Sequence, residues 1–169
     1  MSTERLFIGL WPRGELQQRL AEWRDDWRWP RSASPVATPK LHLTLHFLGD
    51  VASERIGALA DGLALPFSPF DVSVAQPAIW HGGIAVLELD AVPPALLSLH
   101  RDIGAALDTL AINRDTRSYR PHVTMARRAA GAQPPAQPRA LHWPVDSFTL
   151  MASRGGSYDI VREYACTYD

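Results

Sequence analysis

Hydrophobic and polar residues follow one another along this chain in short segments that predict both helices and strands. Apolar residues spaced three and four positions apart predict amphipathic helices over residues 13–27 and 93–110. Residues 53–63 share this spacing and begin with Ser53, a residue type that caps helices. Short apolar runs bounded by glycine, proline or polar residues predict strands over residues 5–11, 41–48, 70–75, 78–80, 84–89, 122–126, 148–152 and 158–168.

Glycine pairs mark the turns between several of these elements. Gly82-Gly83 and Gly155-Gly156 predict hairpin turns, and Gly49-Asp50 predicts a turn that closes the strand 41–48. Strands and helices are intermixed without the regular alternation of parallel βαβ units. We therefore predict an α+β fold with antiparallel strands. No break in composition divides the chain, so we expect a single domain over residues 1–169.

The composition is typical of a folded protein, with 46% hydrophobic residues and a formal net charge of -1. These values exclude disorder as the main state. The longest apolar runs are too short to span a bilayer, and no signal-peptide pattern opens the chain. We expect a cytoplasmic monomer that has no contact with membranes. The single cysteine, Cys166, excludes an internal disulfide and a multi-cysteine zinc site.

The charge also limits the class of partner. A protein that coats a long nucleic acid usually carries a basic excess, which this chain lacks. One phosphate or one nucleotide end remains a suitable ligand. Residues 114–128 contain five arginines against one aspartate, which is typical either of a solvated loop or of a local anion site.

One tetrapeptide pattern occurs twice and stands out from the rest of the sequence. His-Leu-Thr-Leu begins at His42, and His-Val-Thr-Met begins at His122, 80 residues later. Residues i and i+2 of a strand point to the same face, so His42 projects together with Thr44. By the same rule His122 projects together with Thr124. Each predicted strand therefore presents an imidazole and a hydroxyl on one face.

Two such pairs suit the chemistry of a phosphodiester. One imidazole can take a proton while the other gives one, and threonine hydroxyls can donate to phosphate oxygens. A solvated sheet face that merely carries these residues is the simpler alternative. A zinc site is another, but zinc needs more ligands and threonine is a poor one. Neither an acidic cluster for Mg²⁺ nor a phosphate-binding P-loop is present, and we expect no metal or cofactor.

The doubled motif resembles those of the two-histidine (2H) phosphoesterase superfamily. Residues 5–10, 41–50 and 120–127 resemble its bacterial and archaeal RNA 2′,3′-cyclic phosphodiesterase branch, also called 2′-5′ RNA ligase-like or LigT-like. The resemblance implies two pseudo-symmetric lobes around a central cleft, each an antiparallel sheet with outer helices. It also implies metal-independent opening of terminal 2′,3′-cyclic phosphates of RNA to 2′-phosphates, with 2′-5′ ligation as the reverse reaction.

The same resemblance implies a role for each motif residue. His122 is expected to accept a proton from water, and His42 to donate one to the departing 3′ oxygen. Thr44 and Thr124 are expected to hold the phosphate. Arg127 stands where the family has an arginine near the phosphate, although strict strand alternation places it on the face opposite His122.

The first motif departs from the family pattern at His46, where lysine or arginine is common. Strand alternation places His46 on the face of His42 and Thr44, so we expect it to line the cleft and add a pH-dependent positive charge beside the phosphate. The alternative is a hydrogen-bonded residue at the cleft edge. The other face of this strand is predicted to be buried and consists of Leu41, Leu43, Leu45 and Phe47.

Other functions remain open at this point. The expected substrates are RNA ends or nucleoside 2′,3′-cyclic phosphates; 2′-5′-linked oligonucleotides or another cyclic phosphate are the alternatives within the same chemistry. A module that binds nucleotides or RNA ends without turnover is less favoured, because binding alone is served better by arginine and lysine. His81, His100 and His142 lack a comparable neighbour and are predicted to lie on the surface or in hairpins.

Overall fold

The computed structural model describes residues 1–168; Asp169, the last residue of the expected domain, lies outside them. Within this range nine strands form one sheet, in the order β7-β4-β5-β6-β3-β1-β8-β9, with β2 added beside β6. The strands are β1 (Thr3–Leu10), β2 (Ser34–Pro35), β3 (Leu43–Ala52), β4 (Phe70–Trp80), β5 (Ile84–Leu89), β6 (His122–Arg127), β7 (Leu141–Val145), β8 (Ser147–Arg154) and β9 (Ser157–Ala165). The helices are α1 (Glu15–Asp25), α2 (Ile56–Gly62) and α3 (Pro94–Thr109), and the short 3₁₀ segments are η1 (Thr38–Lys40) and η2 (Ser53–Arg55).

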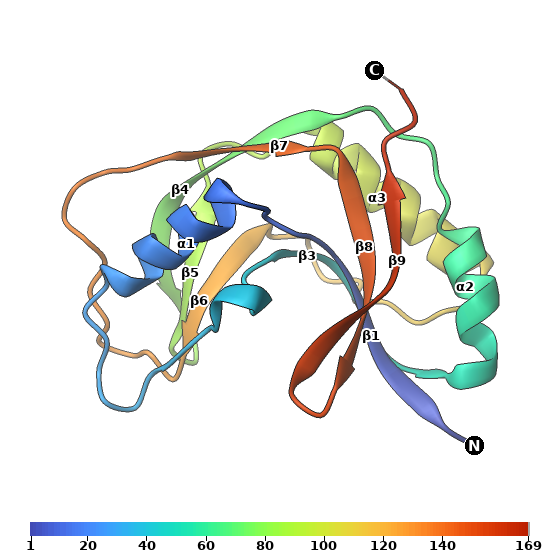
Figure 1. Cartoon of the computed structure of the whole chain (residues 1–169), viewed down its shortest axis with the longest axis horizontal. Coiled ribbons are helices and arrows are strands. Elements are labelled where there is room, and N and C mark those ends of the chain that lie inside the picture. The colour runs from blue at the N-terminus through green and yellow to red at the C-terminus, as the bar shows by residue number, and fades with distance from the viewer. Residues whose placement is uncertain (169) are drawn as a thin grey trace.

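The sheet is antiparallel throughout its pairings, which confirms the predicted α+β fold. Strands β1, β3, β8 and β9 form one half, and β4, β5, β6 and β7 form the other (Figure 1). The halves meet between β3 and β6, where Leu43 pairs with Val123. The two lobes that the resemblance implies are therefore halves of one curled sheet.

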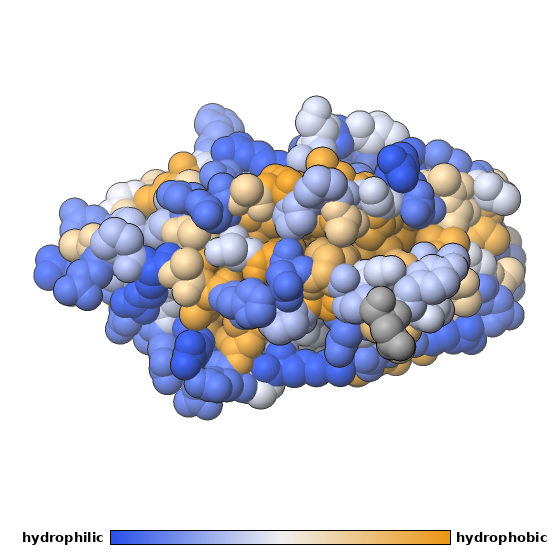
Figure 2. Space-filling model, turned by 90° about the horizontal axis from the view of Figure 1, so that it is seen from above, coloured by the Kyte–Doolittle hydropathy of each residue, from blue (hydrophilic) through white to orange (hydrophobic). Residues whose placement is uncertain are grey.

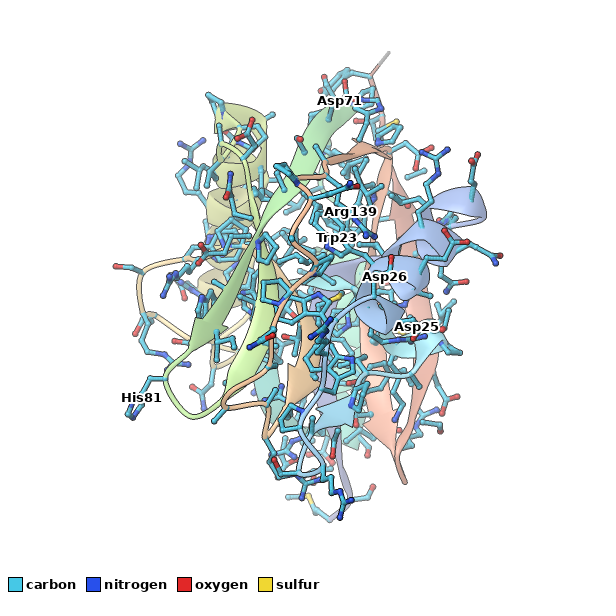
Figure 3. All side chains as sticks on the ribbon, turned by 90° about the vertical axis from the view of Figure 1, so that its left-hand side faces the viewer. Trp23, Asp25, Asp26, Asp71, His81 and Arg139 are labelled. Carbon is cyan, nitrogen blue, oxygen red and sulfur yellow. The ribbon has the colours of Figure 1, made fainter. Side chains whose placement is uncertain are left out.

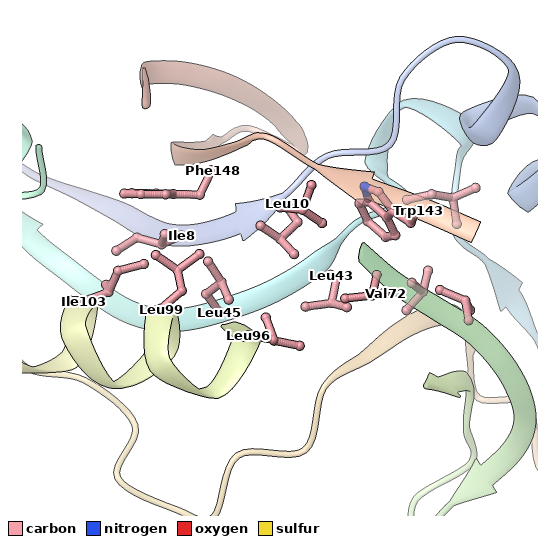
Figure 4. Close-up of a cluster of buried hydrophobic side chains, with 14 of the residues drawn as sticks. Ile8, Leu10, Leu43, Leu45, Val72, Leu96, Leu99, Ile103, Trp143 and Phe148 are labelled. Atoms are coloured by element: carbon pink, nitrogen blue, oxygen red, sulfur yellow. The ribbon is translucent and has the colours of Figure 1, made fainter. Parts of the chain in front are cut away.

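Helix α3 packs its apolar stripe against the β1–β3 half of the sheet. Pro94 is in its first turn, where the missing N–H of proline costs no hydrogen bond. Leu96, Leu99 and Ile103 are buried and face side chains such as Ile8 and Leu45 (Figure 4). Each buried leucine contributes about 2 kcal/mol of hydrophobic stabilisation. The helix therefore supports β3 from the face opposite the one that presents His42.

The surface is mixed in character. Seen from above, hydrophilic residues line the rim of the molecule, and hydrophobic residues occupy the middle of that face (Figure 2). Of the helices that the structure describes, none combines the length and hydropathy that crossing a bilayer requires.

Both predicted glycine hairpins are confirmed, but three local predictions were wrong. Gly49 has a φ of 69° and lies in an irregularity inside β3, which continues to Ala52 rather than turning there. The predicted strands 70–75 and 78–80 are one strand, β4, whose pairing with β5 shifts register between Val74 and Gln76. The side chain of Ser53 caps no helix; its hydroxyl accepts a hydrogen bond from Ser2 at 2.9 Å.

Candidate active site

The two His-x-Thr motifs lie side by side where the halves of the sheet meet. Leu43 of β3 is fully buried and pairs in antiparallel register with a buried valine of β6. One step from this pair in one direction, Thr44 comes beside His122. One step in the other direction, His42 comes beside Thr124. Each imidazole is thus next to the threonine of the other motif, on the face opposite the buried pair.

His42 is held in a neutral form by its neighbours. Its Nδ1 donates to the carbonyl of Lys40 at 2.7 Å, which leaves Nε2 to accept from the Thr44 hydroxyl at 2.8 Å. The Trp11 ring stacks on the imidazole at 4.5 Å and 6°, and Tyr158 meets it edge-on at 5.8 Å. Burial in this aromatic surrounding lowers the pKa of His42 from 6.5 to about 4.

Gly9 provides the space for this arrangement. It pairs with Thr44 across β1 and β3, and a Cβ at this position would lie 3.2 Å from the Trp11 ring and 3.3 Å from the His42 ring. Any larger residue at this position would push against the stacked rings of Trp11 and His42. The glycine in the first predicted strand therefore serves the packing of His42.

His122 has a related but more charged surrounding. Its Nδ1 donates to the carbonyl of Arg120 at 2.7 Å, and the Trp80 ring lies 4.3 Å from the imidazole. Glu88, its register partner on β5, accepts from the Trp80 indole at 3.0 Å and pairs with Arg120 at 2.7 Å. Burial lowers the pKa of His122, and the Glu88 carboxylate opposes that shift.

Arg127 acts electrostatically on both imidazoles. The positive charge of Arg127 lowers the pKa of His42 and also that of His122. His122 in its charged form lowers the pKa of His42 as well. The positive charges of these three groups therefore oppose one another, and an anion bound among them would offset that repulsion.

A β-bulge in β6 explains why strict alternation misplaced Arg127. The pairing between β6 and β5 skips Met125, so Met125 and Ala126 are both buried. The next residue, Arg127, is exposed and returns to the face of Thr124. Sequence parity alone put the guanidinium on the wrong face.

A matching bulge in β3 has the opposite effect on His46. The pairing between β3 and β1 skips Leu45, so Leu45 and His46 are both buried. Phe47, predicted to be buried, is 53% exposed instead. The prediction that Phe47 is buried was therefore wrong. His46 does line the cavity, as predicted, but as a buried residue.

The buried position also decides the charge of His46. Its side chain is 2% exposed, and its Nε2 donates to the carbonyl of His100 at 2.8 Å. Desolvation lowers its pKa, so it is neutral near pH 7. The expected cation beside the phosphate is contradicted, and the alternative of a hydrogen-bonded residue at the edge of the site fits the structure.

A cavity of about 270 Å³ opens between β3 and the segment that leads into β6. Its walls include Thr44, His46, Phe47, Trp80, Tyr119 and His122. A larger cavity of about 580 Å³ lies elsewhere, beside Trp23 and the proline-rich segment 134–140. There Arg139 lies over the Trp23 ring and pairs with Asp26 at 2.8 Å (Figure 3). The smaller cavity is the one that adjoins the His-x-Thr motifs.

The arginine-rich segment does not act as one basic patch. Arg114 pairs with Asp108, and Arg117 pairs with Asp115. Arg120 is engaged by Glu88, as described above. Arg127 forms no ion pair within residues 1–168. Arg128, the fifth arginine, donates to the Ser34 hydroxyl and likewise forms no ion pair within these residues, so Arg127 and Arg128 carry the excess charge of the segment.

The remaining histidines differ in outcome. His81 is exposed in the β4–β5 turn, and His142 is exposed on β7, as predicted (Figure 3 labels His81). His100 is instead half-buried on α3, between the rings of His46 and Tyr119, so its predicted surface position was wrong. Among the described residues, no group of three or more histidine, cysteine, aspartate or glutamate side chains is arranged to hold a metal ion.

Sequence reasoning did not select the aromatic residues around the motifs. Trp11 follows β1 and Trp80 ends β4, and each packs against one of the two histidines. A usable signal was present, since both tryptophans close an apolar run that pairs near a motif strand. Tyr119 had the weaker signal of standing three residues before His122.

Comparisons of this chain with protein families, with known sequences and with solved structures all lead to the same family. Residues 12–157 match the 2′-5′ RNA ligase superfamily. An RNA 2′,3′-cyclic phosphodiesterase of Escherichia coli is 28% identical over 156 residues, which cover 89% of this chain and 87% of that protein. One of Thermus thermophilus is 29% identical over 177 residues, covering 95% and 89%. The crystal structure of E. coli LigT in apo form covers 99% of both chains with a TM-score of 0.87 and 26% identity. LigT complexes with 3′-AMP and with phosphate have TM-scores of 0.84 and 0.82.

Proposed function

This chain belongs to the 2′-5′ RNA ligase superfamily, and on that basis we propose that it is an RNA 2′,3′-cyclic phosphodiesterase. The enzyme hydrolyses terminal 2′,3′-cyclic phosphates of RNA, or of nucleosides, to 2′-phosphates. The observation that supports the proposal most directly is the antiparallel pairing of Leu43 with Val123, which puts the two His-x-Thr motifs on neighbouring strands, with Arg127 acting electrostatically on both histidines. Relatives that align over most of the chain carry the same name for their activity.

Each group has a defined task in this reaction. Water attacks phosphorus while His122 takes its proton, and the bond from phosphorus to the 3′ oxygen breaks as His42 donates a proton to that oxygen. The phosphate remains on the 2′ oxygen. Thr44 and Thr124 donate hydrogen bonds to the non-bridging oxygens, and Arg127 stabilises their negative charge. The two protons balance, so the histidine pair exchanges its protonation states in each turnover.

The resting state of His42 has a consequence for this assignment. In the free protein its Nε2 accepts from Thr44, so the imidazole is neutral at pH 7. An anionic phosphate bound beside the ring favours the charged form and raises its pKa. Substrate binding thus favours the protonated form of His42, which acts as the acid. The rate of turnover is therefore expected to depend on pH in the acidic range.

We expect the pH profile of kcat/KM to be a bell with its maximum below pH 6.5. This profile reports the two pKa values of the free enzyme, and both are lowered, that of His42 to about 4. Because the maximum lies midway between the two values, it is independent of which histidine is the acid. Initial rates at low substrate concentration between pH 4 and pH 9 measure the profile. A maximum above pH 7 would contradict the derived environment of the pair.

The proposed activity is tested by product analysis. Purified protein is incubated with oligonucleotides that end in a 2′,3′-cyclic phosphate, in the presence of EDTA, and the position of the product phosphate is determined by NMR or by enzymatic digestion. We expect a 2′-phosphate. A 3′-phosphate, or binding without turnover, would overturn the proposal. A parallel incubation with 2′-5′ dinucleotides separates it from cleavage of 2′-5′ linkages as the main activity.

A further inference from the structure

We propose that Tyr119 is a positioning residue, which holds Thr44 in the orientation that the phosphate requires. The inference rests on the proposed function. Tyr119 reaches the first motif from the segment that leads into the second, since it stands three residues before His122. Its hydroxyl donates to the carbonyl oxygen of Thr44 at 2.9 Å. One hydrogen bond therefore links the approaches to both motifs.

The hydrogen bond from Tyr119 to Thr44 lies next to the place where the pairing between β3 and β6 stops. Strands β3 and β6 share the single ladder pair Leu43 and Val123 within the described residues. The cavity of about 270 Å³ adjoins this pair, and Thr44, Tyr119 and His122 are among the residues that line it. A single backbone pair restrains the two strands less than a continued ladder would. The hydrogen bond from Tyr119 to the Thr44 carbonyl adds a second connection between the two motifs at this cavity.

The ring of Tyr119 is itself held in place by two histidines. Tyr119 stacks on His100 at 3.8 Å and 12°, and His100 stacks on His46 at 4.0 Å and 15°. His46 donates to the backbone carbonyl of His100 at 2.8 Å, so the stack is joined to α3. The three rings form a column that begins at the buried His46 and ends at Tyr119, which lines the cavity. Such a column leaves the phenol little freedom to tilt or shift.

A fixed carbonyl at Thr44 fixes the direction of its hydroxyl. The carbonyl orientation is set by the backbone torsion of Thr44, and the Cβ of this β-branched residue follows that backbone. The β3 bulge directly after Thr44 interrupts the regular ladder, so the neighbouring strand restrains this residue less than usual. Tyr119 supplies the restraint. The hydroxyl it orients is the partner of His42 in the free protein and a phosphate donor in the proposed reaction.

The test is the substitution Tyr119→Phe, which keeps the stacked ring and removes the hydroxyl. We expect kcat/KM for a 2′,3′-cyclic-ended oligonucleotide to fall about tenfold, equivalent to ~1.4 kcal/mol in transition-state stabilisation. The inhibition constant of inorganic phosphate is expected to rise as well, because Thr44 contacts the anion. Tyr164→Phe is the matched control. Tyr164 lies on β9, away from the site, and its hydroxyl donates to the carbonyl of Ala60 at 2.6 Å. It removes the same kind of bond and is expected to leave both constants unchanged.

A double-mutant cycle separates positioning of Thr44 from a general loss of structure. In a Thr44→Ala background no hydroxyl remains to be oriented, so Tyr119→Phe is expected to change kcat/KM by less than about twofold. A full tenfold effect in that background would overturn the inference, and so would unchanged kinetics of Tyr119→Phe alone. Inactivity of the unmodified protein on the same substrate would refute the proposed function instead, while phosphate affinity would still report on Tyr119.

Discussion

Replacing His42 or His122 with alanine is expected to lower kcat by about 10³-fold while the protein stays folded. General acid or base catalysis by a positioned side chain contributes 10²–10⁴-fold, and in the proposed mechanism each histidine supplies one of the two proton transfers. Neither side chain is part of the hydrophobic core, and each projects from the face opposite the buried pair Leu43 and Val123. Single-turnover rates measured beside circular dichroism spectra check both parts of this expectation.

The leaving group distinguishes the acid from the base. In a nucleoside phosphodiester with a p-nitrophenyl group, the p-nitrophenolate leaves as an anion and needs no proton. The loss of the general acid therefore matters little for the cleavage of this substrate. We expect His42→Ala to recover most of its rate with this substrate and His122→Ala to stay slow. The reverse pattern would exchange the two roles and leave the catalytic pair intact.

A third histidine-to-alanine variant controls for effects of the substitution that are unrelated to the site. His142 is exposed on β7, at the edge of the sheet, and His142→Ala is expected to have unchanged kinetics. Natural-substrate rates that remain within a few fold of the unmodified protein in His42→Ala and His122→Ala would refute the proposed mechanism.

The fold was largely predictable because most elements carry a clear period. Helix α3 has a stripe of apolar residues at helical spacing and a proline in its first turn, and the structure confirms it. Strand β7 escaped prediction although Leu141, Trp143 and Val145 alternate with exposed residues. Pro144 weakens the strand signal, since proline cannot donate to a ladder. β7 lies at the edge of the sheet, where this missing donor is tolerated.

The candidate site was predictable as far as strand alternation remained regular. His and Thr in each motif are two residues apart and precede the bulges, so their common face followed from the sequence. The positions after the bulges did not, because an extra residue in one strand is defined by its pairing with the neighbouring strand. Phe47 is therefore exposed where burial was expected, and His46 is buried although it lines the cavity. Parity put Arg127 on the face opposite Thr124, which the bulge contradicts, whereas its position near the phosphate stays a prediction from the family resemblance.

The bulge in β6 gives Arg127 a role that a substitution should reveal. Arg127→Met is expected to lower kcat/KM about 30-fold, equivalent to ~2 kcal/mol, because in the proposed mechanism this exposed guanidinium, whose charge acts on both histidines, stabilises the phosphoryl charge. Inhibition by inorganic phosphate is expected to weaken in parallel. Arg127→Lys keeps the charge but loses the planar donor geometry, so an intermediate effect is expected. Kinetics at constant ionic strength measure both variants.

The pH profile provides a second and independent readout for the same variant. The charge of Arg127 lowers the pKa of His42 and of His122, so its removal raises both values. The maximum of kcat/KM is therefore expected to move towards neutral pH in Arg127→Met and to stay in place in Arg127→Lys. Arg101→Met is the control, since Arg101 is exposed on α3 and pairs only with its neighbour Asp102 within the described residues. A slower Arg127→Met enzyme with an unshifted maximum would show that the guanidinium acts on folding or packing and lies too far from the histidines to share a phosphate with them.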